Sequence, residues 1–260
     1  MRIIGGEFKR TPIKGPPDER TTRPLPDRVR ESIFNMLSGH MQEQPTVLDC
    51  FAGTGSFGLE ALSRGARRAV FVERDRRIEG LLRGNIEAVG VADRCEVIEA
   101  DALGPLALAR CPDPVTIVMM DPPYAIARDP KAWQRVLRQA SRFAERLTED
   151  GYLLLRTPWP FLQIAEIDEP QPPTRRRSKG ERPTPAQEEV IELSLDDGSL
   201  ESQDADEIEA LFEAIASADA NEPAKPEFVR GSLEIDGTVG PETHEYGTTA
   251  VHWYQRQADG

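Results

Sequence analysis

The chain has 260 residues, of which 38% are hydrophobic and 30% charged, and its 45 acidic and 32 basic residues give a formal net charge of -13. Its longest apolar run, Val115 to Met120, is far shorter than the roughly 20 residues that a membrane-spanning helix needs. The three cysteines lie too far apart for a zinc or disulfide framework, and the three histidines are scattered. With no apolar leader-like stretch at Met1, we expect a cytoplasmic protein with no membrane partner and no metal.

Residues 1–40 are expected to form an N-terminal extension that ends in a helix. Two short extended pieces flank Gly5-Gly6, and a Pro-rich connector follows. Apolar residues at helical spacing predict a helix from about Asp27 to Leu37, with Pro26 in its first turn. The extension is basic, which is typical either of a solvated surface or of contact with nucleic acid. Its cations include Lys9, Arg10, Lys14, Arg23, Arg28 and Arg30.

Residues 41–163 alternate short β-rich apolar runs with helical patterns, which indicates successive βαβ units. The predicted strands are Val47 to Asp49, Ala69 to Glu73, Glu96 to Glu99, Val115 to Asp121 and Tyr152 to Arg156. The predicted helices are Leu59 to Arg64, Arg77 to Val89 and Ala132 to Leu147. The sequence therefore predicts an α/β fold with a Rossmann-like, doubly wound, mostly parallel sheet.

Residues 164–243 carry the excess negative charge, with 21 acidic and 7 basic residues, whereas the rest of the chain has a net charge of +1. Five prolines between 170 and 185 predict an exposed linker. Beyond them, a strand pattern covers Ile191 to Leu195 and a helical pattern covers Ile208 to Ile215. We expect an acidic, Pro-rich, mobile insert here, after which residues 244–260 supply a closing strand, Tyr246 to Tyr254, and a tail.

The first motif with chemical meaning is Asp49-Cys50-Phe51-Ala52-Gly53-Thr54-Gly55-Ser56-Phe57-Gly58, which leads from a predicted strand through three glycines into a helix. Glycine lets a cofactor approach the backbone where a Cβ would collide with it. Glu73 ends the next strand and is placed to accept hydrogen bonds from ribose hydroxyls. Taken alone, the glycine pattern could equally bind a nicotinamide dinucleotide, and the acids Asp49 and Glu73 shift the balance.

The second motif is Asp121-Pro122-Pro123-Tyr124, at the end of the fourth predicted strand. Two successive prolines remove two backbone donors and fix φ, so the turn is rigid and its carbonyls are free to accept. A carboxylate, a free carbonyl and an aromatic face together suit a planar group that carries an amine. We therefore expect Asp121 and the Pro122 carbonyl to accept from that amine while Tyr124 stacks on the ring.

These motifs resemble those of the class I S-adenosylmethionine-dependent methyltransferases, and more closely those of the RsmD family of bacterial 16S rRNA guanine-N2 methyltransferases. The matching runs are Arg2-Ile3-Ile4-Gly5-Gly6, Arg23-Pro24, Asp27-Arg28-Val29-Arg30-Glu31, Phe34-Asn35, Leu48 to Gly55, Gly58 to Ala66, Asp121 to Tyr124 and Tyr246 to Thr249. The resemblance implies a seven-stranded sheet, S-adenosylmethionine as cofactor, and direct methyl transfer to the exocyclic N2 amine of a guanine in small-subunit rRNA.

The resemblance also implies roles for single residues. Asp49, Gly53 and Gly55 would line the methionine end of the cofactor, Glu73 would hold its ribose, and Asp101 would accept from its adenine amine. The implied cofactor-binding residues are thus Asp49, Phe51, Gly53, Gly55, Glu73, Asp101 and Ala102. The implied catalytic residues are Asp121, Pro122 and Tyr124. The implied RNA contacts are Arg10, Arg23, Arg28 and Arg30. The implied partner is 16S rRNA or the assembling small ribosomal subunit, bound by a monomer.

Two departures from the family pattern and several other functions stay open at this point. Leu25-Pro26 replaces a hydroxyl-bearing pair of the family, and the acidic insert, which could recruit a basic protein partner, is no part of the family pattern. A DNA adenine or cytosine amino-methyltransferase would share the Asp-Pro-Pro-Tyr turn, and a protein-glutamine methyltransferase would typically carry Asn in place of Asp121. A dehydrogenase and a non-enzymatic scaffold acting through the insert are the remaining alternatives.

Overall fold

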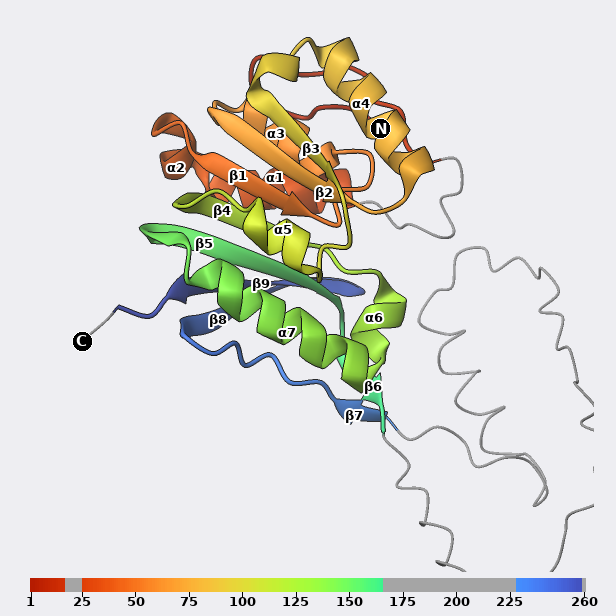
Figure 1. Ribbon diagram of the computed structural model, residues 1–260, viewed down its shortest axis with the longest axis vertical. Helices are drawn as coiled ribbons and strands as arrows, with labels where there is room; N and C mark the ends of the chain where they lie inside the picture. Colours follow the sequence, from red (N-terminus) through yellow and green to blue (C-terminus); the bar gives the residue numbers. More distant parts are fainter. Residues whose placement is uncertain (17–24, 166–227, 259–260) are drawn as a thin grey trace, which may run out of the picture. The chain divides into compact units, whose positions relative to one another are not determined.

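A seven-stranded sheet organises the structure, which is a computed structural model that describes residues 1–16, 25–165 and 228–258 (Figure 1). Its strands are β1 (Thr46–Cys50), β2 (Arg68–Glu73), β3 (Cys95–Glu99), β4 (Val115–Met120), β5 (Leu147–Pro158), β8 (Thr238–Tyr246) and β9 (Thr249–Arg256). They lie in the order β3-β2-β1-β4-β5-β9-β8, and every pair from β3 to β5 is parallel. Strand β9 is antiparallel to both of its neighbours, β5 and β8. The predicted α/β fold with a doubly wound, mostly parallel sheet is confirmed.

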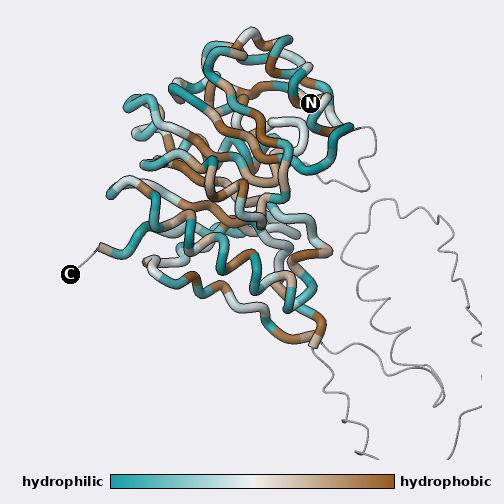
Figure 2. Tube along the Cα trace, viewed as in Figure 1, coloured by the Kyte–Doolittle hydropathy of each residue, from teal (hydrophilic) through white to brown (hydrophobic). Residues whose placement is uncertain are grey.

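Helices cover both faces of the sheet, as expected for parallel strands joined by crossovers (Figure 1). One face packs against α1 (Asp27–Met36), α2 (Ser38–Gln42), α3 (Ser56–Ser63) and α4 (Arg76–Val89). The other face packs against α5 (Pro105–Ala109), α6 (Tyr124–Arg128) and α7 (Pro130–Ala144). A short 3-10 helix, η1 (Ala92–Arg94), precedes β3. Phe34 and Phe71 are buried in the first core layer, and Trp133 and Phe143 in the second. Figure 2 shows the apolar strands enclosed between helices whose outer faces are polar.

Local chemistry sets the ends of the long helices. The side chain of Asp75 caps α4 by accepting from the backbone N–H groups of Arg77 and Ile78, and α4 ends at Gly90, which has φ +78°. Asp129 caps α7 in the same way, so this helix begins two residues earlier than predicted. It also ends three residues earlier, because Leu147 already pairs with Val115 as the first residue of β5.

The N-terminal extension is clamped onto α3. Arg2 and Pro12 form an antiparallel bridge, and the loop between them lies against the helix. The buried carboxylate of Glu60 accepts from the backbone N–H groups of Ile4 at 2.7 Å and Gly5 at 2.8 Å. Gly6 has φ +76°, and a Cβ there would lie 1.9 Å from a backbone oxygen of α3. The paired glycines of the N-terminal motif therefore serve to dock this extension.

The C-terminal part of the chain differs from the expected boundaries. The predicted insert was to end at residue 243, which falls inside β8, and the predicted closing strand 246–254 contains a turn at Gly247 between β8 and β9. The sequence missed this hairpin because the polar run that precedes it lacks strand-like alternation. A separate pair of short strands, β6 (Leu162–Ile164) and β7 (Phe228–Arg230), is antiparallel. The proline-rich stretch and the patterns at 191–195 and 208–215 lie outside the described residues.

Candidate functional site

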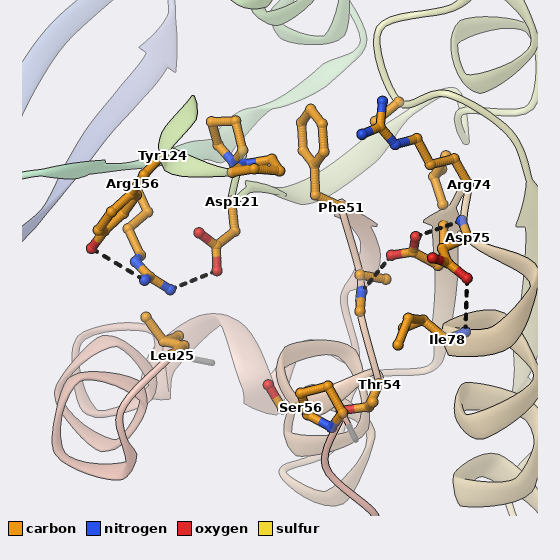
Figure 3. A pocket seen from close by; sticks show the side chains of 18 of the residues that line it. Leu25, Phe51, Thr54, Ser56, Arg74, Asp75, Ile78, Asp121, Tyr124 and Arg156 are labelled. Atoms are coloured by element: carbon orange, nitrogen blue, oxygen red, sulfur yellow. Dashed lines mark hydrogen bonds and ion pairs between the residues drawn. The ribbon is translucent and has the colours of Figure 1, made fainter. Parts of the chain in front are cut away.

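A cavity of about 480 Å³ opens at the carboxyl ends of β1, β2 and β4 (Figure 3). Three segments form most of its wall: the turn that follows β1, the end of β2, and the segment that follows β4. In the sheet order, β1 lies between β2 and β4, so the chain crosses to opposite sides of β1 at this point. Ligands of open α/β sheets bind at such a switch point, outside the carboxyl ends of the strands.

The turn after β1 adopts left-handed backbone conformations. Phe51 has φ +60°, Gly53 +56° and Gly55 +85°. Gly53 lines the cavity, and a Cβ built on it would meet no atom within 4 Å, so a side chain there would project into free space. Gly55 is not among the lining residues, and a Cβ built on it would lie 2.4 Å from Leu82 Cδ1, so packing inside the fold requires a glycine at this position.

Glu73 forms the β2 side of the cavity. Its Oε2 accepts from the backbone N–H of Gly53 at 2.9 Å, and its Oε1 accepts from that of Asp75 at 2.8 Å. These two hydrogen bonds fix the carboxylate and tie the glycine turn to the end of β2. Each carboxylate oxygen has further acceptor capacity, so Glu73 can still accept from hydroxyl groups in the cavity.

Two predicted cofactor residues, Asp49 and Asp101, are not among those that line the cavity. Asp49 is buried, and its Oδ2 accepts from the backbone N–H of Gly58 at 3.0 Å, which holds the start of α3. Burial raises the pKa of the Asp49 carboxyl well above its usual value, and the charges of Asp121 and Glu73 raise it further. Asp101 forms an ion pair with Arg135 at 3.2 Å. Its other oxygen accepts from the backbone N–H of Leu103, and each oxygen keeps further acceptor capacity, so the adenine contact expected of Asp101 stays a prediction; Ala102 beside it lines the cavity.

Asp121 and Tyr124 lie on the opposite side of the cavity from Asp75, together with an arginine that the sequence analysis missed (Figure 3). Nη1 of Arg156 donates to Asp121 Oδ2 at 2.7 Å, and Nη2 donates to the Tyr124 hydroxyl at 3.4 Å. The guanidinium carbon also lies 5.6 Å from the centre of the Tyr124 ring. A signal for Arg156 was present in the sequence, since it is the one charged residue in the apolar run Leu153-Leu154-Leu155-Arg156.

The four predicted RNA-contacting arginines separate into three groups. Arg10 and Arg28 are exposed, as an RNA contact requires, and Arg23 lies outside the described residues. Arg30 is fully buried, which corrects the prediction for this residue. It donates to the Arg2 carbonyl and to Asp27, both at 2.9 Å, and lies 3.8 Å from Glu60. Arg30 therefore supports the docked extension and cannot meet RNA in this conformation.

A family model described as "Conserved hypothetical protein 95" matches residues 1–159. The chain belongs to this family. Ribosomal RNA small subunit methyltransferase D of Escherichia coli K12 is 40% identical over 126 residues, which are 48% of this chain and 60% of that protein. The protein of the same name from Haemophilus influenzae is 37% identical over 127 residues, 48% of this chain and 64% of its own. The match thus spans less than two thirds of either relative, and their names confirm the predicted resemblance to the RsmD family.

A solved structure shows that the fold of this chain also occurs in another protein. The Escherichia coli protein yhhF aligns with 100% of this chain and 99% of its own, at a TM-score of 0.58 and 22% identity, which shows a shared fold. The family model ends at residue 159, so it includes every lining residue of the cavity and Arg156. Strands β8 and β9 lie beyond the matched range.

Three further features of the residues that the structure describes concern the requirements of metal sites, membrane helices and reactive thiols. No group of three His, Cys, Asp or Glu side chains that could hold a metal ion occurs in that part of the chain. Within the same ranges, no helix is long and apolar enough to cross a membrane. Burial raises the pKa of the Cys111 thiol to about 11 and that of Cys95 to about 12, and it raises the pKa of Cys50 well above its usual value. These thiols therefore stay protonated at neutral pH, and Cys50 and Cys111 are buried, as expected of small apolar groups, whereas Cys95 is partly buried.

Proposed function

We propose that this protein is an S-adenosylmethionine-dependent methyltransferase that methylates the exocyclic N2 amine of a guanine in 16S rRNA. One observation carries the proposal: a single cavity unites the open glycine turn with the Asp121-Pro122-Pro123-Tyr124 segment. A nucleotide cofactor and an amine-bearing ring would thereby meet at the ends of adjacent strands. The names of the Escherichia coli and Haemophilus influenzae relatives support ribosomal RNA as the substrate class.

The cavity fits the proposed cofactor in size and in its polar groups. Its volume of about 480 Å³ lies in the range of small-molecule sites. Gly53 leaves space for a ligand against the backbone, and Glu73 offers acceptors for a pair of ribose hydroxyls. Apolar side chains for the adenine ring come from Phe51, Ile78 and Ala102, all of which line the cavity. When bound, S-adenosylmethionine supplies an electrophilic methyl group.

The segment after β4 would receive the target base. An exocyclic amine carries two hydrogens and needs two acceptors, which the free oxygen of Asp121 and the Pro122 carbonyl can supply. Tyr124 begins α6 at the cavity wall and offers an aromatic face for stacking, worth about 1 to 3 kcal/mol per base. The amine lone pair is delocalised into the ring, so the amine is a weak nucleophile. Holding it in line with the methyl group would therefore supply most of the rate enhancement. The negative charge of Asp121 would stabilise the positive charge that develops on nitrogen.

The substrate must present the guanine outside its stack. Extruding a base costs a few kcal/mol, and less for a base in an exposed loop than for one in a duplex. Exposed Arg10 and Arg28, together with Arg23, would bind the RNA phosphates. The partner would be 16S rRNA or the assembling small subunit in the cytoplasm, approached by a monomer.

Radiolabelled methyl transfer tests the proposal directly. Undermodified small ribosomal subunits, naked 16S rRNA and duplex DNA are incubated in parallel with labelled S-adenosylmethionine, and the product nucleosides are identified. We expect N2-methylguanosine from one or both RNA substrates, and none with the Asp121→Ala variant, whose S-adenosylhomocysteine affinity should stay within about threefold of wild type. Label in DNA alone, or in another nucleoside, would overturn the proposal.

A further inference from the structure

Arg156 occupies an unusual place for a charged side chain. It lies near the end of β5 between β4 and β9, follows three buried leucines, and is only 3% exposed. A buried arginine is costly unless its donors are satisfied. The sheet register explains the position: Met120 of β4 pairs with Leu155 of β5, so the next residues along the two strands, Asp121 and Arg156, lie side by side.

Every nitrogen of the guanidinium has a partner. Nη1 donates to Asp121 at 2.7 Å and Nη2 to Tyr124 at 3.4 Å, while Nε donates to Thr249 Oγ1 at 3.2 Å. Thr249 in turn donates to the Thr157 carbonyl at 2.9 Å, which anchors the network to the antiparallel strand β9. The arginine therefore links β5 and β9 to both reactive side chains of the segment after β4.

The ion pair involves one oxygen of Asp121. In Figure 3, Asp121 Oδ2 faces the guanidinium, and no hydrogen bond from the described residues reaches its other oxygen. This second oxygen is the one that a substrate amine could meet. The hydrogen bond from Nη1 restrains the carboxylate through this one oxygen, while Asp121 still lines the cavity.

The same ion pair opposes the effect of burial on Asp121. Desolvation raises the pKa of this carboxyl, and the charge and hydrogen bond of Arg156 lower it part of the way back. The other ionisable groups around this edge are Tyr124 on α6, Asp49 on β1, Glu73 on β2, and Arg74 and Asp75 directly after β2. Of these only Arg74 is a cation, and among the described residues Arg156 is the cation that lowers the pKa of Asp121. Without Arg156, this partly buried carboxyl would protonate more readily and would then offer a donor where the amine needs an acceptor.

We propose that Arg156 is a positioning residue, which holds the Asp121 carboxylate and the Tyr124 ring in place for the target base and keeps Asp121 in its acceptor form. This inference rests on the proposed function for the identity of the base. It concerns a residue outside the two motifs that identify the site, because Arg156 acts through Asp121 and Tyr124.

The test compares Arg156→Gln, which removes the charge, with Arg156→Lys, which keeps it, and with Arg142→Gln as a control on the exposed face of α7. We expect the rate of methyl transfer at pH 7 to fall by about 100-fold or more in Arg156→Gln. At pH 9 the rate of this variant relative to wild type should be at least about tenfold higher than at pH 7. In Arg156→Lys the rate should stay within about tenfold of wild type. The Arg142→Gln variant should match wild type. S-adenosylhomocysteine affinity, measured by calorimetry, should change by less than about threefold in all three variants and also reports that they are folded.

A second measurement separates this inference from the proposed function. The Asp121 carboxyl is followed by carbon NMR of aspartate-labelled protein, and its signal is assigned by its loss in Asp121→Asn. We expect it to titrate at least about one pH unit higher in Arg156→Gln than in wild type. An unchanged titration, a faster Arg156→Gln enzyme, or an equal loss in the Lys and Gln variants would overturn the positioning role. If wild type methylates no RNA, the proposed function fails, and the titration still decides whether Arg156 controls the ionisation of Asp121.

Discussion

Gly53 and Gly55 lie two residues apart in one turn and should respond differently to the same substitution. Both have positive φ, so an alanine at either position costs roughly 1 kcal/mol of backbone strain. A methyl group on Gly53 would enter the cavity, whereas one on Gly55 would press on buried Leu82. We expect Gly53→Ala to weaken S-adenosylhomocysteine binding by about tenfold or more, and Gly55→Ala chiefly to lower the free energy of unfolding, by about 1 to 3 kcal/mol. Calorimetric titration and urea denaturation of both variants measure this, and equal effects on binding would contradict it.

His252 should make the folded state sensitive to mild acid. Its ring is fully buried between Thr157 and Thr243, with ring nitrogens 2.8 and 2.9 Å from their hydroxyl oxygens, and burial lowers its pKa to about 4. The unfolded chain takes up a proton near the ordinary pKa of 6.5, which the folded chain resists. Stability is therefore unaffected above about pH 6.5 and declines as the pH falls toward 4, by at most about 1.4 kcal/mol per pH unit.

Urea denaturation between pH 4.5 and 8 measures this dependence. The raised pKa values of Asp49 and Asp121 act in the opposite sense, so the comparison of interest is between wild type and His252→Gln. We expect a flatter pH dependence in His252→Gln, and the wild-type dependence in His244→Gln, whose side chain is only partly buried beside Glu242. Parallel curves for wild type and His252→Gln would show that the buried imidazole does not cause the acid sensitivity.

At the scale of elements, the attachment of the N-terminal extension to α3 depends on Glu60. This fully buried carboxylate accepts from two backbone N–H groups of the extension and from Arg64 Nε at 2.7 Å, and it lies beside buried Arg30. Glu60→Ala leaves these donors without their acceptor, so we expect a loss of about 3 to 5 kcal/mol in the free energy of unfolding. Glu31→Ala, at an exposed position of α1, should change it by less than about 0.5 kcal/mol. Urea denaturation of both variants tests this, and a loss below about 1 kcal/mol for Glu60→Ala would mean that the extension is held by its apolar contacts.

The elements that the sequence predicted well are those with local signals. The helical spacing of apolar residues located α1, α4 and α7, and apolar runs followed by Gly or Pro located β1 and β4 together with the cavity-lining segments that follow them. What failed depends on contacts between distant residues. In the sequence, Arg30 cannot be distinguished from the other cations of the basic N-terminal extension, because its burial depends on contact with Glu60, thirty positions away. Arg156 gains its meaning only from the register that places it beside Asp121.

For the whole molecule, the register of β6 and β7 predicts which part of the acidic insert, residues 164–243, is dispensable for folding. Ile164 and Phe228 are direct partners in this antiparallel pair, so a two-residue Asn-Gly turn can join them in place of residues 165–227. We expect this shortened chain to unfold within a few degrees of wild type and to bind S-adenosylhomocysteine equally well, as followed by calorimetry. Removal of residues 164–243 would instead delete β7 and most of β8, and should lower the melting temperature sharply. Equal melting temperatures for the two deletions would show that β8 adds little to the sheet.

The same replacement should change the affinity of the protein for its proposed RNA substrate. Residues 165–227 carry 18 acidic and 6 basic side chains, so their removal changes the formal net charge from -13 to -1. Phosphates are repelled by a negative chain over distances of about a Debye length, which is roughly 10 Å at 0.1 M salt and 3 Å at 1 M. We expect the shortened protein to bind an rRNA fragment more tightly than wild type at low salt, with the difference vanishing toward 1 M. Binding titrations at several salt concentrations measure this. Weaker binding by the shortened protein at all salt concentrations would mean that these residues contact the RNA favourably, and their acidity would then have to be offset by direct contacts of the basic run Arg175-Arg176-Arg177.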